Sequence, residues 1–192
     1  MASQALMRWR HAASLRLKNV EAARLAVGGR AAIQVLAAEQ IKHAYVVLPS
    51  SHFQAFCRDL HTEAVDHLYP AVAPSAVQGI VKMLLTRNRM LDRGNPNAGN
   101  IGSDFNRFNF NFWQEVIAFD GKNADHQRQI DALNSWRNAV AHQDFAPSNL
   151  VGVARLDMAV IRKWQSACNR LASSFDGVIS DRLAAIIGHR PW

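Results

Sequence analysis

Apolar side chains recur every three or four positions along almost the whole chain, which is the spacing of one face of an α-helix. Short groups of Gly, Pro, Asn and Ser, the residues that favour turns, separate these stretches. No alternating run rich in Val, Ile and Thr stands out at the length of a strand, so the pattern predicts an all-α protein. The predicted helices cover residues 3–18, 20–48, 52–69, 75–91, 108–117, 124–142 and 150–187.

Turn-forming residues set the expected ends of these helices. A Pro followed by two Ser predicts a turn and a helix N-cap, a Pro after an apolar run predicts a helix end, and Gly pairs predict breaks. The expected breaks lie at Gly28-Gly29, Pro49-Ser50-Ser51, Pro70, the loop 92–103, Gly121–Asn123 and near Gly177.

Short loops imply that consecutive helices pack as antiparallel neighbours. A chain of 192 residues with 49% hydrophobic and 19% charged residues can bury one substantial core. We therefore expect an N-terminal helical arm over residues 1–45, packed on an antiparallel helical bundle of four to five helices over residues 46–192.

The chain is strongly basic, with a net charge of +7 and a sequence pI of about 10.1. Arg far outnumbers Lys, and the guanidinium group binds phosphate through two hydrogen bonds at once. Polyanions are therefore the favoured partners, and a basic surface without functional consequence is the alternative.

Cysteines and hydropathy indicate the compartment. Cys57 and Cys168 stand alone in apolar helical contexts, which favours small core residues over metal ligands and requires no oxidising compartment. No stretch approaches the roughly 18 apolar residues that span a bilayer. Residues 1–20 are basic like a transit peptide, but the helical pattern continues to residue 44 without a change of composition. We expect a cytoplasmic protein without metal, cofactor or membrane.

One segment carries chemistry. Arg137-Asn138-Ala139-Val140-Ala141-His142 places a permanent cation, an amide and an imidazole within two turns of the predicted helix 124–142. Arg stabilises phosphoryl charge and His transfers protons near neutral pH, which together suffice to cleave RNA without a metal. In a chain of this composition, Arg followed five residues later by His is expected about 0.7 times by chance, and about 0.05 times with Asn after the Arg. The alternative is a helix-terminal His that caps the helix beside a surface Arg.

At these residues the chain resembles the HEPN superfamily, small helical bundles found in many prokaryotic ribonucleases and in toxin–antitoxin or abortive-infection systems. Its motif is Arg followed after four to six residues by His, often with Asn next to the Arg. Ser51–Leu60 resembles an earlier helix of the RiboL-PSP-HEPN-like branch, and Gly94–Asn97 resembles a loop of that branch. The resemblance covers residues 40–170 and departs at Gln143-Asp144, where many relatives have Gly or another small residue after the His.

The resemblance implies a metal-independent endoribonuclease in a toxin–antitoxin or phage-defence system, with RNA and an antitoxin protein as partners. One motif supplies one His, whereas transesterification uses a base for the 2′-OH and an acid for the leaving 5′-oxygen. A homodimer with the active site at its interface would supply both, and the resemblance implies this arrangement. His142 would then act as base or acid, Arg137 would stabilise the charge on the non-bridging oxygens, and Asn138 would orient the imidazole or hold the phosphate.

Four further residues are candidate contacts to RNA, namely Arg58, Asp59, Arg87 and Asp144. Arg87 stands with Arg89 just ahead of the predicted loop, with Arg93 after them at its start, and ordinary surface charge is the alternative for this group.

Two other groups are candidates for a cleft. His61 could reach one with an adjacent carboxylate, although a solvated polar face is the favoured interpretation. In the aromatic run 105–112, Phe108 and Phe112 are predicted to be core, while Phe105 or Phe110 is free to stack on bases.

Two rival functions stay open at this point. One is a non-catalytic HEPN-like module that binds a nucleotide or RNA or forms a dimer interface. The other is a basic helical DNA- or RNA-binding protein without activity. No helix-turn-helix signature supports this alternative specifically.

Overall fold

The computed structural model describes residues 1–26, 32–153 and 155–192, and every regular element in these ranges is helical. The chain is all-α, as the sequence predicts. The α-helices are α1 (Gln4–Ala26), α2 (Ala32–Val72), α3 (Gln78–Thr86), α4 (Ala98–Phe105), α5 (Phe112–Phe119), α6 (Asn123–His142) and α7 (Met158–Ile187). Short 3₁₀-helices lie at Ser75–Val77, Met90–Asp92, Asn106–Phe108 and Pro147–Asn149. No helix of the described ranges is long and apolar enough to cross a membrane.

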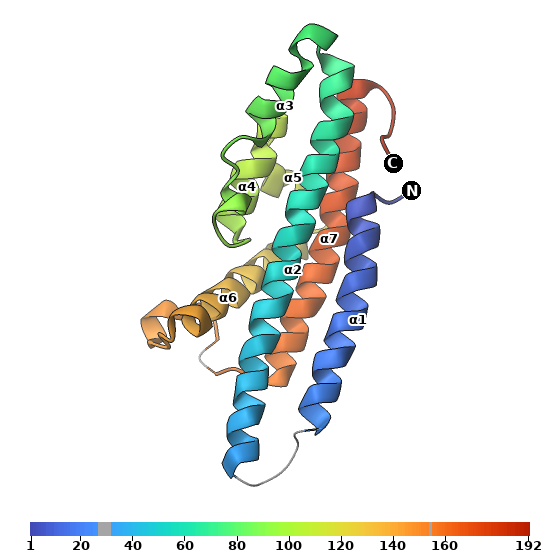
Figure 1. Cartoon of the computed structure of the whole chain (residues 1–192). Coiled ribbons are helices and arrows are strands. Elements are labelled where there is room, and N and C mark those ends of the chain that lie inside the picture. The colour runs from blue at the N-terminus through green and yellow to red at the C-terminus, as the bar shows by residue number, and fades with distance from the viewer. Residues whose placement is uncertain (27–31, 154) are drawn as a thin grey trace.

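Three long helices, α1, α2 and α7, lie side by side and form the body of the molecule (Figure 1). The short helices α3, α4 and α5 lie toward one end of α2, and α6 crosses the long helices at an angle while contacting α2 and α7. The centre of the core is largely aromatic, with Phe53, Phe112, Trp164 and Phe175 fully buried. Burial of each such side chain contributes about 1.5–3 kcal/mol, so these rings account for much of the packing energy.

The first turns of α1 are fastened to the body. The Glu63 carboxylate accepts hydrogen bonds from the N–H groups of Gln4 and Ala5 at 2.8 and 2.9 Å, which caps the helix N-terminus. Trp9 packs edge-on against Phe53. The expected domain boundary at residues 45 and 46 falls inside α2, which runs through it without interruption.

Two prolines lie within α2, so the expected turn at Pro49 and the expected helix end at Pro70 are both wrong. Pro49 removes one helical N–H donor, but it is buried, and tertiary packing on both sides holds the helix together. Ser50 is no N-cap, since its hydroxyl donates to the Asn134 side chain on α6 at 2.8 Å. Pro70 lies so close to the helix end at Val72 that it disturbs little.

Two other helices begin at positions that differ from the prediction, because a side chain caps the N-terminus of each. Asn97 lies in the expected loop 92–103, yet its side chain accepts the Asn100 N–H at 2.8 Å and begins α4 there. Asp157 accepts the Val160 N–H at 2.8 Å, and α7 therefore begins at residue 158 instead of 150. Capping residues and turn residues are the same types, which explains both differences.

Glycine breaks no helix at position 177. An added Cβ there would lie 2.9 Å from the Phe119 ring, so Gly177 serves close packing between α5 and α7. The expected break at Gly28-Gly29 lies outside the described residues.

The aromatic run 105–112 belongs mostly to the core. Phe105 is fully buried and stacks on Phe112 with ring centroids 4.5 Å apart, so the expectation that it is free to stack on bases is wrong. Phe110 is partly exposed, and the Arg182 guanidinium lies 5.4 Å from its ring centroid.

Candidate functional site

The motif occupies the last turns of α6. This helix covers residues 123–142, close to the predicted 124–142, because Ile130, Leu133 and Trp136 form a continuous buried seam. Gln143 ends it in the left-handed conformation, with φ of 54°, and its N–H bonds the Ala139 carbonyl. His142 is thus the last helical residue, and its side chain is exposed at the end of α6 that points away from the long helices (Figure 1).

A stripe of three polar residues on α6 holds the loop before α4. Asp131, Asn134 and Asn138 are spaced by three and four positions, so they share one helix face. Their bonds join Asp131 to the Ala98 N–H at 2.9 Å, Asn134 to the Pro96 carbonyl at 2.9 Å, and Asn138 to the Asn95 amide. Burial raises the pKa of Asp131, although the Ala98 hydrogen bond opposes this shift.

Asn138 also contacts its neighbour in the motif. Its side-chain oxygen accepts one hydrogen bond from the Asn95 amide and another from the Arg137 guanidinium, the latter at 3.3 Å. The oxygen therefore links the loop to the Arg of the motif. The geometry favours a role for Asn138 in positioning Arg137.

A hollow of about 350 Å³ lies beside the end of α6. Its lining residues are Ser135, Asn138, Ala139, His142, Asp144 and Asn149. The loop after α6 forms one wall, because the Asp144 carboxylate accepts the Ala146 N–H at 3.1 Å and the Asn149 amide at 2.7 Å. Both carboxylate oxygens of Asp144 therefore accept hydrogen bonds from within the loop.

Some of the predicted site residues line the hollow, and others do not. Asn138, His142 and Asp144 line it. Arg137 is not one of the lining residues, but its guanidinium is hydrogen-bonded to Asn138, which is. The hollow of one chain contains a single imidazole.

The candidates Arg58 and Asp59 lie elsewhere. Phe145, just past the motif, stacks on His43 of α2 with ring centroids 5.4 Å apart. Arg58 follows His43 by fifteen residues of α2, or about 22 Å along the helix axis. Asp59 is paired with Arg8 of α1 at 3.3 Å. Neither residue lines the hollow.

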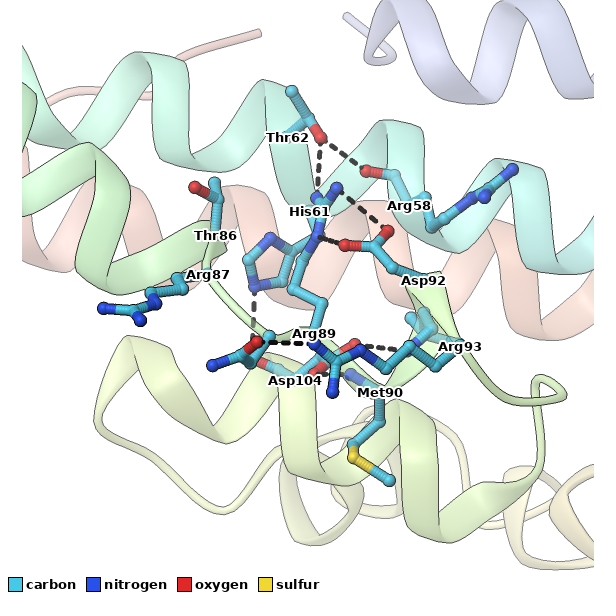
Figure 2. A network of polar contacts seen from close by, with 12 residues as sticks. Arg58, His61, Thr62, Thr86, Arg87, Arg89, Met90, Asp92, Arg93 and Asp104 are labelled. Atoms are coloured by element: carbon cyan, nitrogen blue, oxygen red, sulfur yellow. Dashed lines mark hydrogen bonds and ion pairs between the residues drawn. The ribbon is translucent and has the colours of Figure 1, made fainter.

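The third distant candidate, Arg87, ends α3 beside a polar cluster (Figure 2). The Asp104 carboxylate is buried there and accepts the Met90 and Leu91 N–H groups at 2.8 and 2.9 Å. Arg89 bonds the Thr62 hydroxyl at 2.8 Å and pairs with Asp92. Arg89, which belongs to the arginine group expected to contact phosphate, therefore makes these polar contacts within the protein.

His61 lies at the centre of this cluster and is fully buried, so the expectation of a solvated polar face is wrong. Its Nε2–H donates to the Asp104 carbonyl at 3.2 Å, and its Nδ1 has no hydrogen-bond partner among the residues that the structure describes. The ring packs against Phe105 and Phe108. Burial, helped by the nearby Arg89 charge, lowers the pKa of His61 from 6.5 to about 3, and the ring is neutral near pH 7.

Sequence reasoning missed three residues of the site, Asn95, Ser135 and Asn149. The spacing of the polar stripe on α6 was the signal available, since three polar residues on one helix face need partners when that face is covered. No group of three or more His, Cys, Asp and Glu side chains suited to a metal ion occurs within the described ranges.

Comparison of the chain with protein-family models, with curated proteins and with solved structures finds no match. The resemblance to the HEPN superfamily therefore rests on the residues of the motif and on the two shorter segments.

Proposed function

We propose that this chain is a metal-independent endoribonuclease of the HEPN kind that cleaves RNA by attack of the ribose 2′-OH on phosphorus. The observation that carries the proposal is an intact Arg-Asn-x-x-x-His at the exposed end of α6, where Asn138 and His142 line one hollow. The net charge of +7 supports a polyanionic substrate. The proposed setting is a toxin–antitoxin or phage-defence system in the cytoplasm.

The roles follow from the chemistry of each group. One His142 imidazole takes the proton of the 2′-OH, and a second, protonated imidazole gives a proton to the leaving 5′-oxygen. The products carry a 2′,3′-cyclic phosphate and a free 5′-hydroxyl. Arg137, oriented by Asn138, stabilises the charge on the non-bridging oxygens. The internal nucleophile makes a metal-bound water unnecessary for this step.

A homodimer is part of the proposal, because one hollow holds one imidazole. A two-fold axis that apposes two motif helices would bring two His142 and two Arg137 side chains to one phosphate. In this proposal Asp144 lines the hollow but does not contact phosphate. Its carboxylate would repel phosphate and already accepts hydrogen bonds from its own loop.

The test is incubation of the purified protein with total RNA and tRNA in EDTA, with mapping of the fragment ends by mass spectrometry. We expect His142→Ala and Arg137→Ala to lose cleavage by about a hundredfold or more while folding normally. The matched control is His189→Ala, which removes another exposed imidazole and should cleave like the wild type. Equal cleavage by wild type and His142→Ala would contradict the proposed role of the motif.

One observation favours a second candidate, a non-catalytic HEPN-like module that binds a nucleotide or RNA or forms a dimer interface. Asn138 and Asp144 both have partners within the chain, so the motif also serves to hold the loops around α6. In that case the folded wild type would bind RNA in a filter assay but leave it intact.

A further inference from the structure

α3 lies on the surface of the body, and its Leu85 side chain packs against the core. The Lys82 ammonium lies 2.7 Å from Asp66 of α2 and 5.3 Å from the ring centroid of Tyr69. The Gln78 amide donates to the Ala73 carbonyl at 3.1 Å just after α2. None of the nine residues of α3 is buried.

Other apolar residues, on α3 and just before it, are exposed. Val77, Ile80, Met83 and Leu84 are exposed, with Ile80 at 54% and Leu84 at 66%, and we call these four side chains the α3 face. Val77 lies in the 3₁₀-helix just before α3, and the helical positions of the other three fall within an arc of about 100°. A surface helix of a monomer ordinarily turns such an arc to the core, and an exposed apolar patch marks an interaction site.

We propose that the α3 face is covered by the α3 face of a second copy of this chain in a two-fold dimer. An isologous interface places the same patch on both sides, so an apolar surface meets an apolar surface without a separate partner. The one cation within α3, Lys82, is paired with Asp66, so it does not oppose the contact, and Arg87 lies just past the C-terminal end of α3. This interface does not require the chain to be a ribonuclease.

The area of the α3 face indicates how far the interface extends. The four side chains expose roughly 400 Å² on one copy, within the range of the largest patches on monomers. Two copies would bury roughly 800 Å² through α3 alone, whereas a specific interface needs about 1,000 Å² or more. A second contact between the copies must therefore add to it.

The end of α6 is placed to supply that contact. Figure 1 shows α3 and the far end of α6 on the same side of the three long helices. Phe145 and Val151, which follow α6, are both exposed. A two-fold axis that runs alongside the long helices on this side would pair both α3 and both α6 ends. Only the further step, that this pairing completes the catalytic site, rests on the proposed function.

Sedimentation velocity over a range of micromolar concentrations tests the dimer. We expect wild type to dimerise, and the double variant Ile80→Lys with Leu84→Lys to raise the dissociation constant by about a hundredfold or more, because each dimer would bury four lysines against apolar side chains. The matched control Ile186→Lys replaces an exposed isoleucine of α7 and should dimerise like wild type. Both changed side chains of α3 are more than half exposed, so circular dichroism should show an unchanged fold.

A monomeric wild type, or a double variant that dimerises like the wild type, would overturn the interface. RNA cleavage is scored separately on the same proteins. A dimer that leaves RNA intact would keep the interface and refute the ribonuclease. A cleaving monomer would refute the interface and the two-imidazole mechanism, and would keep only the cleavage activity.

Cross-linking gives a second measurement that does not depend on the lysine variants. The chain has two cysteines, both buried, and burial raises the pKa of both thiols, that of Cys168 to about 12. A cysteine introduced by Leu84→Cys is then the reactive one. A short bis-maleimide should join two copies of Leu84→Cys and leave the control Ile186→Cys mostly monomeric. Equal cross-linking of the two variants would contradict the interface.

Discussion

Acid should destabilise this protein through His61 before its carboxylates are protonated. The His61 ring is enclosed, its Nδ1 finds no partner within the described part of the chain, and burial holds its pKa at about 3, against 6.5 for an unperturbed imidazole. Between these two values the unfolded chain binds a proton at this residue and the folded chain does not. The unfolded state therefore gains stability as the pH falls, and the folded state becomes relatively less stable below pH 6.5.

The size of the effect follows from the two pKa values. Each pH unit within this window costs about 1.4 kcal/mol, so His61 alone should lower the free energy of unfolding by about 2 kcal/mol between pH 6.5 and pH 5. That is a large share of the 5–15 kcal/mol typical of a domain. The raised pKa of Asp131 and Asp176 acts in the opposite sense, because a carboxyl protonated more easily in the folded state stabilises it as the pH falls through that pKa.

Urea unfolding at pH 7.5, 6.5 and 5 measures this contribution. The comparison is between wild type and His61→Gln, in which a side-chain amide can still donate to the Asp104 carbonyl but does not titrate. We expect wild type to lose about 2 kcal/mol more than the variant between pH 6.5 and pH 5. Equal losses in the two proteins would show that His61 does not carry the pH dependence of stability.

Two further predictions concern packing and the motif. Gly102→Ala should cost about 1–2 kcal/mol in urea unfolding, because the new Cβ would lie 3.0 Å from the Trp113 ring, which a hydrogen bond to a backbone carbonyl holds in place. Gly79→Ala is the control, with open space around its Cβ, and should stabilise by about 0.5–1 kcal/mol; equal effects of the two would contradict this account. Asn95→Ala and Asn138→Ala should each weaken RNA cleavage and combine non-additively, because they remove the same hydrogen bond; strictly additive losses in a double-mutant cycle would argue against coupling.

The sequence predicts the helical class and α6 well, for a physical reason. Ile130, Leu133 and Trp136 recur at helical spacing between clear stop signals, so local pattern and tertiary packing agree. Pro49 shows where this agreement fails. A proline costs a helix about one hydrogen bond and a steric clash, but burial on a neighbouring helix offsets that cost, and no local signal reports the burial.

The candidate site was only partly predictable. Spacing along one helix brings Asn138 and His142 to one hollow, because that relation is local. The placement of Arg58 and Arg87 depends on which helices meet, and here tertiary structure places neither on that hollow. The Asn95 contact joins residues 43 positions apart, which no single-sequence spacing rule can reach.

The proposed dimer would meet two separate needs, one at the hollow and one at α3. The hollow of one chain offers one imidazole, while cleavage at phosphorus by proton transfer needs an acid and a base. The four apolar side chains of the α3 face are exposed on one chain. A second copy on the side of the molecule that carries α3 and the end of α6 would supply the second imidazole of the proposed reaction and would cover the α3 face from water. If substitution in the α3 face abolished both dimerisation and cleavage while the fold persisted, the two requirements would have one structural origin.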